Sequence, residues 1–218
     1  MKLLMSRYMG KTGTSARRSN GVLVEGFLYR NQLQPAAWLN ADGSTRATFV
    51  YGLRPNVPAY MVQGGVTYRF ITDQVGSVRL VVNTATGSVV ERIDWDEFGN
   101  VLADSAPGFQ PFGFAGGLRD TSTGLTLFGA RDYDSVTGRW TAKDSVRFGG
   151  GQTNLYEYVS GDPINRIDPD GHYWWVVVGT VVGAGIGGFS AYNAGGDTAS
   201  ILARMAVGGM TGFAGSLT

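Results

Sequence analysis

Cysteine is absent from the 218 residues, and histidine occurs once, as His172. The first absence excludes disulfide bonds, thiolate metal sites and cysteine nucleophiles. A single histidine excludes a metal site built from several histidines and argues against a Ser-His-Asp triad, because a lone histidine is more often structural. We therefore expect no metal ion and no cofactor.

Charge is also scarce and unevenly distributed. Charged residues make up 16% of the chain and hydrophobic ones 43%, which is enough apolar material for a folded core. Residues 1–20 carry five basic side chains and no acid, residues 21–171 carry twelve basic and sixteen acidic ones, and the remainder carries Asp197 and Arg204. The basic start predicts a flexible, solvated arm, with a membrane surface or nucleic acid as the alternative partner. The acidic middle argues against nucleic-acid binding.

Short runs of β-branched and aromatic residues alternate with turn residues from about residue 21 to 104. Strands are predicted at residues 27–30, 48–51, 66–72, 75–82 and 88–95, with turns at 40–43, 83–87 and 96–100. The runs recur at irregular intervals of about 20 residues, which favours stacked hairpin units that cover one another. The sequence therefore predicts a mainly β chain of irregular antiparallel hairpins, and we expect further wall upstream of it.

Several phrases carry a specific resemblance, and they occur in one order along the chain. They are TDQVGSVRLV (72–81), DWDEFGN (94–100), PFGFAGG (111–117), GARDYD (129–134), TGRW (137–140), DPIN (162–165) and DPDG (168–171). Together they resemble YD-repeat (RHS) proteins, and the densest part resembles the RHS-repeat-associated core domain. The resemblance implies an arm at 1–20, a YD-repeat wall at 21–110, a core domain at 111–171 and a Gly/Ala-rich apolar tail at 172–218.

The resemblance also implies an activity. Core domains of this family close a hollow β-shell of polymorphic toxins and can act as an intramolecular aspartyl protease that frees the C-terminal segment. Here the catalytic pair would be Asp144 and Asp168, with the cut between His172 and Tyr173 and Arg139 orienting a carboxylate. Two adjacent carboxylates cannot both ionise easily, so one serves as base for a water molecule and the other as acid.

A structural interpretation of the same residues stays open. Asp-Pro-Asp-Gly is a good β-turn sequence without any catalysis, and Asp144 lies in a polar stretch typical of a solvated loop. The family usually has leucine where this chain has His172, and often proline where it has Ser145. The alternative function is therefore a non-catalytic scaffold, with Asp162 and Asp170 as turn formers.

The tail predicts a different environment. Residues 173–196 contain no charged side chain, and Gly179, Gly183 and Gly187 fall on one face of a helix. The length meets the transmembrane criterion, and residues 198–207 add a second helix, so the tail predicts an apolar helical hairpin. Three alternatives stay open: membrane contact through 173–196, burial inside the shell, and a leader that has lost its toxin.

The resemblance further implies partners and a location. The partners would be the upstream RHS shell, a delivery apparatus and an immunity protein. Residues 3–5 are too short for the apolar region of a signal peptide, which leaves a specialised non-Sec route or cell-surface association.

Overall fold

The computed structural model describes residues 5–9, 14–19, 22–31, 33–52, 54, 56–145, 154–172 and 175–176. A ten-stranded antiparallel sheet takes up the first half, and its strand order follows the chain, as stacked hairpins require. Its strands are β1 (Met5–Met9), β2 (Thr14–Ser19), β3 (Val22–Tyr29), β4 (Pro35–Asn40), β5 (Thr45–Val50), β6 (Tyr60–Gln63), β7 (Val66–Thr72), β8 (Val78–Asn83), β9 (Val89–Trp95) and β10 (Val101–Asp104).

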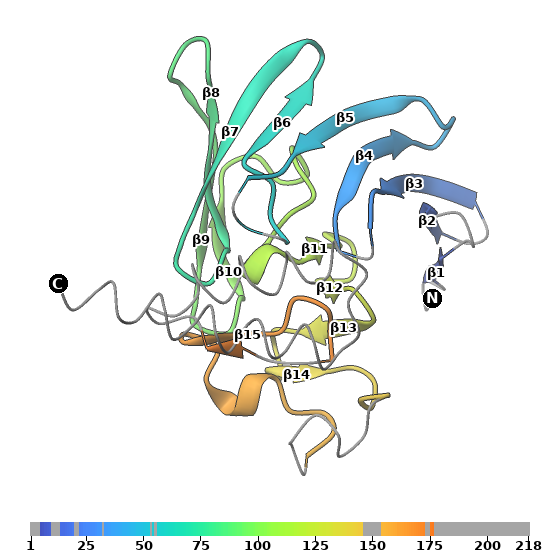
Figure 1. Ribbon diagram of the computed structural model, residues 1–218, viewed down its shortest axis with the longest axis vertical. Helices are drawn as coiled ribbons and strands as arrows, with labels where there is room; N and C mark the ends of the chain where they lie inside the picture. Colours follow the sequence, from blue (N-terminus) through green and yellow to red (C-terminus); the bar gives the residue numbers. More distant parts are fainter. Residues whose placement is uncertain are drawn as a thin grey trace, which may run out of the picture.

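Two small antiparallel sheets follow, and the large sheet curves around them as an arch (Figure 1). The first contains β11 (Leu118–Arg119), β12 (Thr126–Phe128), β13 (Arg131–Asp134) and β14 (Arg139–Trp140). The second pairs β15 (Arg166–Ile167) with β16 (Trp175–Val176). Two 3-10 turns, η1 (Phe114–Gly116) and η3 (Val159–Gly161), connect them to their neighbours.

Period-two alternation decides which face of the large sheet is buried. In β9, Glu91, Ile93 and Trp95 are buried while the intervening residues are more exposed. Two apolar cores result. One lies against the large sheet and includes Phe112. The other contains residues of β9 and an aromatic cluster made of Phe114, Phe128, Tyr133, Trp140 and Tyr158.

Ala115 links the segment after the large sheet to residues that precede β10, through two hydrogen bonds. Its N–H donates to Ser77 Oγ at 3.0 Å, and its carbonyl accepts from Asn56 Nδ2 at 2.6 Å. The residue is fully buried and has φ of +48°, a conformation that non-glycine residues adopt only when their surroundings impose it. The large sheet and the segment that follows it therefore share one packed junction.

The predicted mainly β architecture of irregular antiparallel hairpins is confirmed, and β7, β8 and β9 coincide closely with predicted runs. The structure differs at both ends. Strands β1 and β2 stand where a flexible arm was expected, because β3 offers its edge to β2 for backbone pairing and β2 in turn pairs with β1. Trp175 and Val176 form β16, where the apolar run favoured a helix, because β15 supplies a partner strand.

The rest of the predicted helical hairpin, including Tyr173 and residues 177–196, lies outside the described residues. Within the described part of the chain, no helix has the length and apolar character needed to cross a membrane.

Candidate functional site

Two buried carboxylates contact one guanidinium, that of Arg131. Asp144 and Asp168 are 8% and 3% exposed. Oδ2 of Asp144 lies 2.8 Å from Nη2 of Arg131, and Oδ2 of Asp168 lies 3.2 Å from the same nitrogen. The fold thus brings together two acids far apart in the sequence, with a cation between them.

Each of the three side chains is placed by its own element. Arg131 begins β13 on the same inward face as Tyr133, and its guanidinium lies 4.2 Å from the centre of the Trp140 ring. Asp144 follows β14, where its N–H donates to the Leu155 carbonyl at 3.1 Å. Asp168 directly follows β15. Three short strands therefore position the cluster.

The turn Asp168–Gly171, called the closing turn below, ends in a peptide link to His172 whose carbonyl and N–H are both hydrogen-bonded. Arg131 Nε donates to the Gly171 carbonyl, and the His172 N–H donates to Asp168 Oδ1 at 3.0 Å and Asp170 Oδ1 at 2.9 Å. Gly171 has φ of +75°, and a Cβ there would lie 2.5 Å from the Phe128 carbonyl oxygen. Only glycine fits this position, so the turn presents His172 to the carboxylates in a fixed way.

Burial raises the pKa of Asp168 well above its ordinary value of 3.8. The nearby charge of Asp170 and a hydrogen bond with it raise this pKa further, while Arg131 and the His172 N–H oppose the rise. A carboxyl group whose pKa is raised keeps its proton to higher pH, which favours a role as general acid.

The His172 side chain folds back onto the first acid. Its Nδ1 lies 3.7 Å from Asp144 Oδ1 and 3.4 Å from Ser145 Oγ. Asp144 therefore faces two groups able to carry positive charge, Arg131 at one oxygen and His172 at the other.

The structure brings together some residues of the predicted site and not others. Asp144, Asp168 and His172 come together, whereas Tyr173 lies outside the described residues. Arg139 is exposed in β14, on the face opposite Trp140, so the alternation of the strand turns it away from the cluster. The structure places Arg131 on the carboxylates instead of Arg139.

Two residues of the cluster were not predicted from the sequence. Arg131 lies in a predicted strand, and the feature that could have identified it is that it shares a strand face with the aromatic Tyr133 two residues later. Asp170 was treated as a turn former, yet its carboxylate also accepts the His172 N–H and acts on Asp168. Asp162 does form a turn, because Asn165 donates to it from both its backbone and its side chain.

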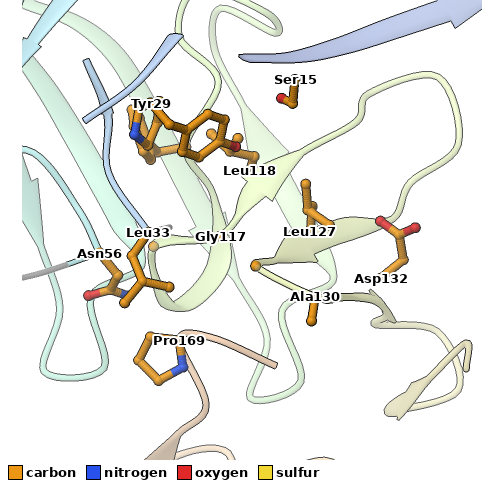
Figure 2. Close-up of a pocket in the computed structure, with 14 residues that line it drawn as sticks. Ser15, Tyr29, Leu33, Asn56, Gly117, Leu118, Leu127, Ala130, Asp132 and Pro169 are labelled. Atoms are coloured by element: carbon orange, nitrogen blue, oxygen red, sulfur yellow. The ribbon is translucent and has the colours of Figure 1, made fainter. Parts of the chain in front are cut away.

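A cavity of about 260 Å³ is lined in part by Pro169 of the closing turn. Figure 2 shows Tyr29 and Leu118 above it and Pro169 below it, with Leu33 next to Pro169 and Ala130 on the right. Neither acid of the cluster lines this cavity. Within the part of the chain that the structure describes, no group of three or more histidine or acidic side chains is placed to hold a metal ion.

Comparison with known proteins identifies the fold family. A family model described as the teneurin YD-shell matches residues 7–164. The chain belongs to the YD-shell family. Teneurin-3 of Danio rerio is 33% identical over 134 residues, which are 59% of this YD-shell chain and 5% of the relative. Teneurin-1 of Gallus gallus is 30% identical over 149 residues, 66% of this chain and 6% of the relative.

A bacterial relative covers more of the YD-shell chain. The tRNA3(Ser)-specific nuclease WapA of Bacillus spizizenii is 25% identical over 193 residues, 86% of this chain and 8% of the relative. The crystal structure of TcdB2-TccC3-TEV matches with a TM-score of 0.57 and 19% identity, over 77% of this chain and 9% of that one. TcdB2-TccC3 matches with a TM-score of 0.53 and 19% identity, over 72% and 9%. The chain thus spans less than a tenth of each of these proteins and shares the shell fold of the solved ones.

Proposed function

We propose that this YD-shell chain cuts its own backbone once, between His172 and Tyr173, and so releases the C-terminal segment from the shell. The observation that carries the proposal is the pair of buried carboxylates held by Arg131 next to the closing turn. Arg131 and Asp168 hold the peptide link just before the proposed scissile one. Because the scissile link belongs to the same chain, its effective concentration at the site is high.

The two acids have different roles in the proposed step. Asp168 keeps its proton, because its pKa is raised, and gives it to the departing Tyr173 nitrogen. Asp144 accepts a proton from a water molecule whose oxygen attacks the His172 carbonyl carbon. The bond between that carbon and nitrogen breaks, which leaves a carboxyl group on His172 and an amine on Tyr173. Arg131 is the positioning residue for both acids and for Gly171.

A non-catalytic shell scaffold is the second candidate, and one observation favours it. Each acid has a structural partner, because Arg131 Nη2 contacts both carboxylates and Asp168 also accepts the His172 N–H. In that case the cluster would only fix the closing turn. The two candidate functions differ in whether the bond between His172 and Tyr173 is broken, so the mass of the purified chain distinguishes them.

The experiment compares the intact mass of the purified chain with that of Asp144→Asn and Asp168→Asn. Scission predicts fragments of residues 1–172 and 173–218 from the parent chain and neither fragment from the two variants. Asp162→Asn is the matched control, because it removes a turn carboxylate away from the cluster and should leave cleavage unchanged. An uncut parent chain at every pH between about 4 and 8 would leave the scaffold as the function.

We further propose that the chain works as part of a larger exported shell. The chain spans less than a tenth of its relatives, which supports an upstream shell and a delivery apparatus as its partners. An immunity protein and membrane contact through residues 173–196 remain predictions from the sequence. Co-purification of the two fragments after cleavage would show that the wall retains its cargo.

A further inference from the structure

Trp140 presents its ring face to the guanidinium that contacts the two acids. The central carbon of this guanidinium, Cζ of Arg131, lies over the ring at 4.2 Å from its centroid. Strands β13 and β14 pair so that Tyr133 is directly opposite Trp140, which leaves Arg131, two residues earlier in β13, at the diagonal position. Diagonal neighbours on one face of a sheet lie within reach of aromatic and long side chains. The strand register therefore brings the ring and the cation together.

Arg131 contacts three oxygen atoms through two of its nitrogens. Its Nη2 lies 2.8 Å from Asp144 and 3.2 Å from Asp168, and its Nε donates to the Gly171 carbonyl. The N–H bonds of a guanidinium all point outward in one plane, so an aromatic ring can cover a face of the group without displacing any of them. The attraction between a cation and an aromatic face is strongest where both are removed from water. Trp140 is 3% exposed and the Arg131 side chain 6%, so this condition is met.

We propose that Trp140 is a positioning residue for the self-cleavage, because its ring fixes the plane in which Arg131 holds Asp144, Asp168 and Gly171. This inference rests on the proposed self-cleavage. A guanidinium held only at its edge is free to tilt, and a tilt would move both carboxylates relative to the link after residue 172. Misplacement of reacting groups by about 1 Å can slow a reaction on the order of a hundredfold. Trp140 takes no part in proton transfer and acts through Arg131.

The ring itself has little freedom to move. Three aromatic rings contact it, with centroids between 5.2 and 5.9 Å away, and they belong to Phe128, Tyr133 and Tyr158. The Trp140 backbone is held as well, because its N–H donates to the Tyr156 carbonyl at 3.0 Å. A ring fixed in this way can impose its orientation on an arginine side chain, which has many rotamers of its own.

The large sheet provides a matched pair for comparison. Cζ of Arg46 lies over the Trp38 ring at 3.7 Å from its centroid, and Trp38 is also 3% exposed. This pair joins β5 to β4, and Arg46 donates to the Gly108 carbonyl at 3.0 Å. A weaker attraction in this second pair should lower the stability of the large sheet and leave the cleavage rate unchanged.

The test weakens the attraction at residue 140 while it keeps the shape of the ring. Mono-, di- and tetrafluorotryptophan are placed at residue 140 alone, by stop-codon suppression in cell-free synthesis. Fluorine withdraws electrons from the ring face and so weakens its attraction for a cation. After a short pulse of synthesis, conversion of the full chain into the fragment 173–218 is followed by mass spectrometry. Release should slow stepwise along the series, by about two- to tenfold for the tetrafluoro ring, and should not slow when the same series is placed at residue 38.

Two ordinary substitutions extend the series. Trp140→Phe keeps an aromatic face and should retain more of the cleavage than Trp140→Leu, which keeps an apolar side chain without that face. Urea unfolding of each variant separates a slow cut from a loss of fold. A Trp140→Phe chain that cuts no faster than Trp140→Leu, with both folded, would count against the aromatic face as the cause.

The outcomes that overturn the inference are distinguishable from failure of the proposed function. Equal rates along the series at residue 140, or equal slowing at residues 38 and 140, would overturn the role of Trp140 and leave self-cleavage standing. A parent chain that never cleaves overturns the proposed function, and this inference with it. A nitrogen-15 spectrum reads the contact itself through the Arg131 Nε resonance, which is assigned by its loss in Arg131→Lys. This resonance should move with tetrafluorotryptophan at residue 140 and not at residue 38, and an unmoved resonance in both chains would overturn the contact.

Discussion

Arg131 and Gly171 lie forty positions apart in the chain, and Arg131 Nε donates a hydrogen bond to the Gly171 carbonyl. The same guanidinium binds both buried carboxylates through Nη2. A single side chain therefore couples the strand β13, the loop after β14 and the closing turn. Since a planar guanidinium can meet several oxygens at fixed angles, arginine suits this position better than lysine does.

Replacement of Arg131 should abolish cleavage and destabilise the packing around the four-stranded sheet. Arg131→Met leaves two buried carboxylates without their cation, and breaking a buried pair in this way costs about 3–5 kcal/mol. Arg131→Lys keeps one charge but cannot reach both acids and Gly171, so it should fold better and still fail to cleave. Urea unfolding and fragment mass measure the two effects. Arg92→Met is the control, because its ion pair with Asp94 is exposed and should contribute less than about 1 kcal/mol.

Gly171→Ala should disrupt the closing turn, and Gly87→Ala provides a matched comparison. The two glycines have φ of +75° and +74°, so both substitutions carry the same backbone strain of about 1–2 kcal/mol. Only residue 171 adds a collision, because its Cβ would lie 2.5 Å from the Phe128 carbonyl oxygen, whereas nothing lies within 4 Å at residue 87. We expect a further loss of about 1–3 kcal/mol and no cleavage for Gly171→Ala. Equal stability and equal cleavage of the two variants would contradict a fixed turn.

Glu91 should make the wall less stable as pH rises. Its side chain is 1% exposed on the inner face of β9, and burial raises its pKa to about 7, assisted by the charge of Asp104. A raised carboxyl pKa contributes stability that is full below the unfolded value of 4.5 and is lost as pH rises through about 7. Glu91→Gln should therefore match the parent chain near pH 4 and exceed its stability by about 3 kcal/mol above pH 7. Urea unfolding at several pH values measures this, and parallel stability curves would show that Glu91 is not the cause.

The wall was largely predictable from the sequence, because period-two alternation and turn residues are local signals. Residues 66–72, for example, alternate clearly and form β7 with the same bounds. Strands β1 and β2 were not predictable in this way. Residues 14–19 are polar and basic, and they form a strand because β3 offers its edge, which is a contact that no local pattern records.

The candidate site was predictable only in part. The acids Asp144 and Asp168 came from the family resemblance, since spacing alone does not bring residues so far apart together. Arg131 was missed because a strand pattern does not say which arginine faces the interior, and Arg139 was chosen as the nearer one in sequence. The contact between Ser145 and His172 depends on the closing turn packing against the loop after β14, which is a tertiary arrangement.

The most direct test of self-cleavage is refolding of the uncut chain in water enriched in oxygen-18. Water-mediated hydrolysis by Asp144 and Asp168 predicts that the heavy oxygen enters the new carboxyl group of the fragment that ends at His172, together with a partner fragment that begins at Tyr173. Asp168→Asn should give neither fragment. A fragment without the label, a cut at another link, or an intact chain would contradict the account.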